Sequence, residues 1–140
     1  MNEAAQVREE FINSLKKDYR LPIEKIKGKC LYEINGLIVN IKVQKADNSY
    51  FNVSENRLLG LKTKKTDYFI WVYGDANNFS VISNKKMYEL TRNAPIDRSS
   101  NGNMRYFHIK MNGKEAYFIG KGTKIEISEY YRNLKPIMEA

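Results

Sequence analysis

Three polar side chains stand on two alternating runs that flank an Asn-Gly dipeptide. Residues 31–45 read LYEINGLIVNIKVQK, in which Glu33 precedes the dipeptide and Asn40 and Lys42 follow it. Asn35-Gly36 is the strongest short-range signal for a two-residue β-hairpin turn, because both of its residues accept a positive φ. Side chains alternate between the two faces of a strand. This turn is therefore expected to bring an acid, an amide and an amine within a few ångströms on one sheet face.

The register of this hairpin also predicts where its apolar side chains point. With a two-residue turn, Glu33 faces residue 38 and Asn40 faces residue 31. The opposite face then carries only apolar and aromatic side chains, namely Tyr32, Ile34, Val39, Ile41 and Val43. A half-exposed antiparallel sheet with its polar face toward water explains the same alternation without any chemistry. The spacing alone leaves both interpretations open.

The order of these residues resembles the motif of the PD-(D/E)XK nuclease superfamily. That motif has an acidic strand residue, a tight turn, and then acid-x-Lys on the next strand. Here Glu33, Asn40 and Lys42 stand at its three positions. The resemblance extends over roughly residues 5–92. It implies an α/β (α+β) fold of the restriction-endonuclease-like type, with a mixed central β-sheet flanked by helices, and one such domain over residues 1–140.

The resemblance implies a metal-dependent DNA endonuclease that hydrolyses phosphodiester bonds, of the homing or restriction type. Glu33 and Asn40 would hold a Mg²⁺ or Mn²⁺ ion. Lys42 would steady the attacking water and the charge that develops on the phosphate. A bound metal lowers the pKa of its water by several units, so such chemistry needs no histidine base.

Two departures from the motif weaken the implied metal site. The first acid is usually Asp, and Glu33 is longer; the second is usually charged, and Asn40 is not. Hard cations prefer carboxylate oxygens. Glu10, on an expected N-terminal helix, is a further candidate, because some members of the superfamily place a helical Glu beside the metal; a solvated surface glutamate is the alternative. A catalytically degenerate nucleic-acid-binding or inhibitory module on the same fold is the competing hypothesis.

The positive charge of the chain favours a polyanionic partner. The formal net charge is +8 and the pI is near 9.5, a balance typical of proteins that bind nucleic acid. Lysines that serve only solubility are the alternative. We expect the partner to be double-stranded DNA, gripped by two basic segments: Lys25, Lys27 and Lys29, and Lys62, Lys64 and Lys65. A chain this small is expected to cut both strands as a homodimer or higher homo-oligomer.

Periodicity and turn signals predict the elements that position these residues. Apolar residues repeat every four over 3–17 and favour an amphipathic helix. Strands are expected over 29–34, 37–44, 50–53, 68–73 and 79–82, and a second hairpin over 106–111 and 115–119. The uninterrupted apolar run 68–73 is typical of a strand buried on both faces. Shorter helical segments are expected over 54–59, from Asn84 to about 91, and from Ser128 to Pro136, with a polar loop over 93–104.

Cysteine content and hydropathy limit the class of protein further. The chain has 140 residues, which suits one domain, and a single cysteine, Cys30. One cysteine excludes an intramolecular disulfide and a cysteine-based zinc site within one chain. No apolar run approaches the roughly 20 residues of a membrane span. We therefore expect a cytoplasmic protein with no membrane partner.

Overall fold

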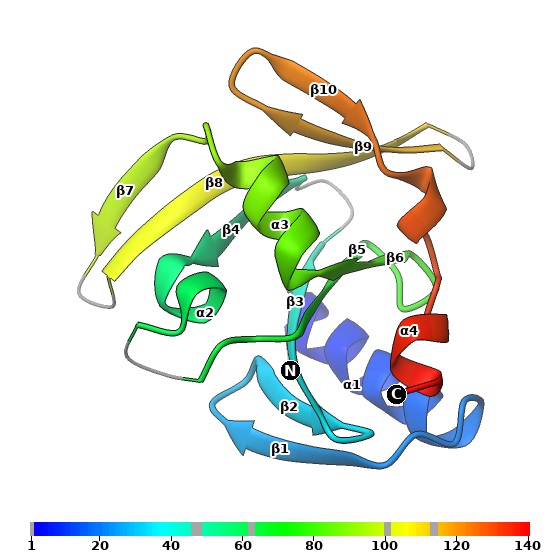
Figure 1. Ribbon diagram of the computed structural model, residues 1–140. Helices are drawn as coiled ribbons and strands as arrows, with labels where there is room; N and C mark the ends of the chain where they lie inside the picture. Colours follow the sequence, from blue (N-terminus) through cyan, green and yellow to red (C-terminus); the bar gives the residue numbers. More distant parts are fainter. Residues whose placement is uncertain (1, 46–48, 62–63, 100–101, 113–114) are drawn as a thin grey trace.

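Two β-sheets packed against each other form the centre of the computed structural model (Figure 1), which describes residues 2–45, 49–61, 64–99, 102–112 and 115–140. Sheet A has the strand order β1-β2-β3-β5-β6. Sheet B has the order β10-β9-β8-β4, with β7 also paired to β8. The protein is therefore an α+β protein with few helices.

Sheet A is built around a central parallel pair. Its strands are β1 (Ile23–Lys27), β2 (Leu31–Ile34), β3 (Leu37–Gln44), β5 (Tyr68–Tyr73) and β6 (Phe79–Ser83). β3 and β5 run parallel, with Asn40 opposite Phe69 and Lys42 opposite Trp71, and the other neighbouring pairs are antiparallel. Parallel neighbours need a crossover connection, which here contains β4 and α2.

Sheet B contains the second predicted hairpin. Its strands are β4 (Tyr50–Ser54), β7 (Ile96–Ser99), β8 (Gly102–Asn112), β9 (Glu115–Gly120) and β10 (Thr123–Glu126). The hairpin over 106–119 is confirmed by the β8–β9 pairing; its turn residues 113–114 lie outside the described residues. The chain has two sheets where one central sheet was expected, because β4 pairs with β8 instead of joining sheet A.

The prediction of a polar loop over 93–104 is wrong for most of that segment. Ile96 pairs with Arg105 and Asp97 with Met104, so β7 and the start of β8 form a hairpin there. The local composition hides this pairing, since it lacks apolar alternation. The strand is instead held in place by its continuation, where Phe107 and Ile109 are buried in the core.

The N-terminal helix matches its prediction. α1 spans Glu3–Lys17 and buries Val7, Phe11 and Leu15, and the side chain of Asn2 caps it by accepting a hydrogen bond from the Ala5 N–H. α2 (Glu55–Leu59), in the segment predicted to be helical, lies between its N-cap Ser54 and a left-handed Gly60 with φ 68°.

The later helices differ from their predictions. The N-cap of α3 (Asn84–Thr91) is Ser83, whereas Asn84 is buried and donates from its amide to the carbonyls of Leu58 and Thr66. The single helix expected from Ser128 is instead a 3₁₀ turn, η1 (Ser128–Tyr130), followed by α4 (Lys135–Met138). Pro136 stands in the first turn of α4 rather than after its end, a position where its missing N–H costs no hydrogen bond.

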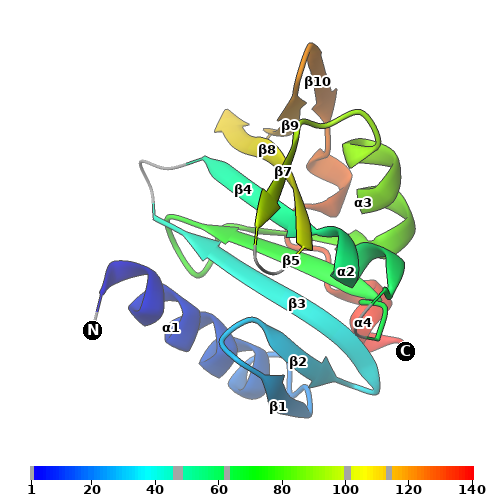
Figure 2. The same cartoon turned by 90° about the vertical axis from the view of Figure 1, so that its left-hand side faces the viewer.

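Two hydrophobic clusters lie on the two faces of sheet A. The first joins the sheet to α1 and α4 through residues such as Phe11, Ile41 and Ile137. The second lies between the two sheets and is rich in aromatic rings, chiefly Phe51, Phe69, Trp71, Phe107 and Phe118. The layers therefore follow the order α1, sheet A, sheet B (Figure 2). None of the helices in the described residues is both long and apolar enough to cross a membrane.

The aromatic layer between the sheets is expected to carry much of the stability. Trp71 is fully buried, and its ring lies 5.0 Å from Phe107 and 5.2 Å from Phe51. Trp71→Ala should lower the free energy of unfolding by about 3–5 kcal/mol, because it leaves a cavity at the sheet interface. Urea denaturation followed by circular dichroism measures this.

The matched control is Leu61→Ala, because Leu61 is 64 % exposed. Its effect should stay within about 0.5 kcal/mol. Equal losses in the two variants would contradict a core centred on the sheet interface.

Candidate functional site

The β2–β3 hairpin places the three candidate residues on one face of sheet A. Asn35 (φ 51°) and Gly36 (φ 83°) both take positive φ in the turn. Glu33 pairs with Ile38, and residues two apart on a strand point the same way. Glu33, Asn40 and Lys42 therefore share a face, as predicted, and the opposite face carries the predicted apolar set against α1.

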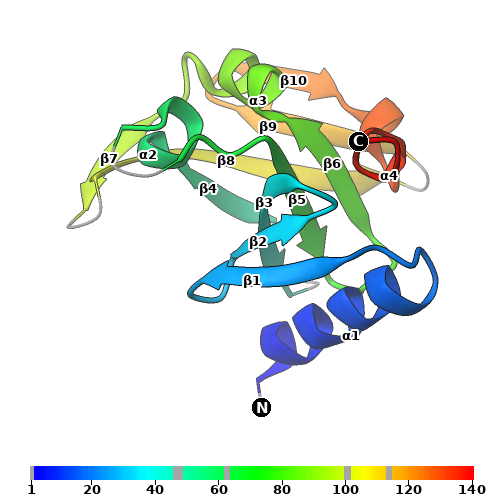
Figure 3. The ribbon, with the colours of Figure 1, turned by 60° about the horizontal axis from the view of Figure 1, so that its bottom comes forward.

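Their surroundings nevertheless differ along this face. Glu33 is exposed, whereas Asn40 is only 4 % exposed and Lys42 is half-buried. The difference arises because sheet B covers the β3–β5 part of the face but leaves the β1–β2 part open (Figure 3). The side-chain oxygen of Asn40 is buried and has no hydrogen-bond partner among the residues that the structure describes.

The amine of Lys42 links sheet A to β4, a strand of sheet B. It donates to the backbone carbonyl of Asn52 at 3.0 Å and to the side-chain oxygen of Asn52 at 2.6 Å. Burial lowers the pKa of this amine. The electrostatic interaction with Cys30 raises the pKa in part, whereas the nearby charges of Arg57 and Arg8 lower it further. Lys42 thus ties β3 to β4, and its amine is occupied by this contact.

Glu10 lies on the other side of sheet A. The buried residues of α1 pack against the apolar face of the hairpin, which is opposite the face of Glu33, Asn40 and Lys42. Glu10 is exposed and lines a shallow pocket on the outer side of α1, together with Gln6, Glu9 and Asn13. The sheet therefore separates Glu10 from the other three candidates.

The residues present do not fit the Mg²⁺ or Mn²⁺ ion that the resemblance implies. Within the described part of the chain, no group of three or more His, Cys, Asp or Glu side chains is placed to hold a metal. Glu33 is the single carboxylate of the set and is exposed, while Asn40 is neutral and buried. Hard divalent cations take six or more oxygen ligands and favour carboxylates.

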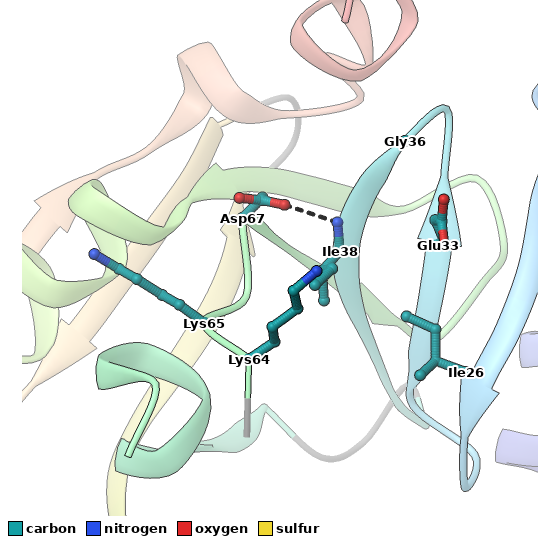
Figure 4. A pocket seen from close by; sticks show the side chains of 7 residues that line it. All are labelled: Ile26, Glu33, Gly36, Ile38, Lys64, Lys65 and Asp67. Carbon is teal, nitrogen blue, oxygen red and sulfur yellow. Dashed lines mark hydrogen bonds between the residues drawn. The ribbon is translucent and has the colours of Figure 1, made fainter. Parts of the chain in front are cut away.

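A groove opens on the exposed part of the same face. Its volume is about 600 Å³, and it is lined by Ile26, Glu33, Gly36, Ile38, Lys64, Lys65 and Asp67. One wall is the β1–β2 hairpin and the other is the connection between α2 and β5 (Figure 4). Lys64 extends across the groove toward Ile38, whereas Lys65 extends away from Glu33.

Two sets of hydrogen bonds fix the connection that carries Lys64 and Lys65. The carboxylate of Asp67 accepts from the Ile38 N–H at 2.8 Å, and the Asp67 N–H donates to the Ile38 carbonyl at 2.8 Å. The buried amide of Asn84 holds the carbonyl of Thr66 at 2.8 Å. The two lysines therefore precede a segment of backbone that hydrogen bonds hold beside β3.

The predicted cationic residues lie around this groove and along the edge of sheet A. Lys27 pairs with Leu31, on the face of Glu33, whereas Lys25 pairs with Tyr32, on the face of α1. Lys25, Lys27, Lys29, Lys64 and Lys65 are all exposed. Lys62 lies outside the described residues. Lysines on an edge strand also discourage pairing with another chain, which is a second reason for their presence on β1.

Comparison with protein-family models, curated proteins and solved structures found no match to this chain.

Three positioning residues were not predicted from the sequence. Asn52 holds Lys42, Asp67 braces the groove, and Asn84 anchors the connection. Asp67 carried a local signal, since it directly precedes the apolar run 68–73. Asn52 carried none, because its partner is set by the packing of the sheets.

The lowered pKa of Lys42 predicts a pH-dependent contribution to stability. The unfolded chain binds the proton more tightly than the folded chain, so stability from this group rises with pH between the folded pKa and the ordinary value near 10.5. The wild type should therefore gain free energy of unfolding relative to Lys42→Met as pH increases toward 10. Urea denaturation at several pH values measures this difference.

Tyrosine titration affects both proteins in this comparison and cancels in the difference. A gap between Lys42→Met and the wild type that stays constant from pH 7 to 10 would contradict a desolvated amine.

Proposed function

We propose that the protein is a nucleic-acid-binding module that grips duplex DNA at the groove of sheet A without metal-dependent cleavage. The observation that carries the proposal is the separation on one sheet face. The exposed part of the face has a groove lined by Lys64 and Lys65, while beyond it Asn40 is buried and Lys42 is half-buried and bonded to Asn52. The order of α1, the β2–β3 hairpin, β5 and β6 supports a degenerate relative of the restriction-endonuclease-like fold.

Charge supports DNA as the partner. With a net charge of +8, the protein attracts a polyanion at long range. Lys64 and Lys65 line the groove from the α2–β5 connection, and Lys27 lies on β1, on the same sheet face as Glu33. Lysine amines position a phosphate backbone without reading its sequence. Glu33 and Asp67 also line the groove, and the carboxylate of Asp67 is bonded to the Ile38 N–H.

A metal-dependent nuclease is the second candidate, supported by the common face of Glu33, Asn40 and Lys42. Two features weigh against it: one carboxylate in the set, and an amine already bonded to Asn52. Dimerisation on two-fold DNA sites, as expected from the small size of the chain, stays a prediction for either candidate.

Duplex binding should weaken steeply with salt. If about six phosphates are neutralised, the logarithm of the association constant should fall against the logarithm of salt concentration with a slope of about −5. Replacing Lys64 and Lys65 with Ala should reduce this slope by about 2, because two phosphate contacts are lost. Fluorescence anisotropy with a labelled duplex measures both proteins.

The matched control replaces Lys16 and Lys17 on α1 with Ala, which removes the same charge from the far side of sheet A. Its slope should stay near that of the wild type. Duplex affinity that does not respond to salt, or an equal loss in both double variants, would contradict binding at the groove.

The wild type and Asn40→Asp should both leave supercoiled plasmid intact with Mg²⁺ or Mn²⁺. Asn40→Asp adds a carboxylate at a buried position, while the single exposed carboxylate of the set stays on Glu33. Agarose-gel nicking assays with a chelator control measure this. Metal-dependent nicking by Asn40→Asp that Lys42→Ala abolishes would instead establish the nuclease candidate.

A further inference from the structure

The outer face of sheet B carries a row of aromatic side chains. Its inner face supplies Phe51, Phe107 and Phe118 to the core. Because side chains alternate, the residues between them point outward. Tyr50 pairs with His108, Asn52 with Tyr106, and Lys110 with Tyr117. The outward side chains are therefore Tyr50, Asn52, Tyr106, His108, Lys110 and Tyr117, of which Asn52 also binds the Lys42 amine.

This face is left open in the described part of the chain. α2 and α3 pack on the inner side, since Leu58, Met87 and Leu90 belong to the cluster between the sheets. His108 and Lys110 are exposed, and the tyrosines are half-buried. This open sheet face carries four aromatic rings on three adjacent strands, and none of these rings packs in the core between the sheets.

The rings are fixed in position by neighbouring groups. Tyr50 and Tyr106 lie 5.5 Å apart with an angle of 31° between their planes, and Tyr50 meets His108 edge-on at 5.9 Å. The Tyr106 hydroxyl donates to Asp97 at 2.6 Å, a bond that raises the pKa of Tyr106 to about 12. These contacts reduce the ordering cost of a ligand that stacks on the rings.

Cations accompany the rings. Lys110 stands opposite Tyr117, and the Lys124 amine lies 4.5 Å above the Tyr117 ring. The acids at this face are Asp97 and Glu115, which accept hydrogen bonds from tyrosine hydroxyls, and Glu126, which pairs with Tyr117. The local charge is mixed, and the net charge of +8 supplies the long-range attraction.

We infer that this outer face, which we call the aromatic platform (Tyr50, Tyr106, His108, Lys110 and Tyr117), binds single-stranded nucleic acid by stacking unpaired bases. Base stacking on aromatic side chains tolerates any sequence, and nearby cations bind the backbone. Duplex DNA cannot use such a platform, because its bases are already stacked. A neutral polysaccharide could stack on the rings, but the positive charge of the protein favours a polyanion. The inference concerns a different face from the groove of sheet A and stands independently of it.

The test uses the full chain and a fluorescently labelled twenty-nucleotide oligo(dT), with anisotropy as the readout. Tyr106→Ala and Tyr50→Ala should each weaken binding by about ten-fold, as expected for the loss of one stacked base. Tyr106→Phe keeps the ring and loses only the hydroxyl, with its bonds to Asp97 and Tyr50, so its affinity should stay within about two-fold. Tyr88→Ala, which removes a tyrosine from α3, is the off-face control and should bind as the wild type does.

The failure of this inference is distinguishable from failure of the groove proposal. The double replacement of Lys64 and Lys65 should reduce duplex binding and largely spare oligo(dT), whereas the platform variants should do the reverse. Circular dichroism confirms that each variant is folded. No binding to oligo(dT), equal binding by Tyr106→Ala and the wild type, or retention on a neutral polysaccharide with no oligo(dT) binding would each overturn the inference.

Discussion

The packing of sheet B against the Trp71 face of sheet A is the constraint on which the rest of the structure depends. Rings from both sheets meet there, with Phe51 and Phe107 on one side and Phe69 and Trp71 on the other. Aromatic side chains bury large areas, and such contacts dominate the energetics of a core. Because this contact covers only the β3–β5 part of sheet A, it buries some polar residues of β3 and leaves the hairpin beyond them in water.

The same packing decides which polar groups can meet a ligand. At the edge of this contact, the half-buried Lys42 amine is satisfied by Asn52, as a desolvated cation requires. Outside it, the groove keeps Glu33 with Lys64 and Lys65. On the far side of sheet B, alternation turns the intervening tyrosines outward. The packing of the two sheets therefore leaves two open faces of different character: a groove lined by Lys64, Lys65, Glu33 and Asp67, and an aromatic face on sheet B.

Local signals predicted the parts of the fold that are fixed locally. The four-residue apolar repeat gave α1 its limits, and Asn35-Gly36 gave the hairpin its register, because periodicity and turn chemistry act over a few residues. The burial of Asn40 could not be predicted in this way, since it depends on a sheet whose strands β4 and β8 lie about fifty residues apart in the chain. The separation of Glu10 from the hairpin face was missed for the same reason. A motif fixes which residues share a strand face, and tertiary packing decides which of them meet solvent.

Lysine footprinting tests most directly whether a phosphate backbone binds at the groove or at the Lys42–Asn52 contact. The folded protein would be acetylated briefly with and without duplex DNA, and the modified peptides quantified by mass spectrometry. Duplex DNA should protect Lys64 and Lys65 and leave the low reactivity of Lys42 unchanged, because the Lys42 amine is already bonded to Asn52. Protection of Lys42 with no change at Lys64 and Lys65 would contradict the account and place the phosphate at the position that the nuclease resemblance implies.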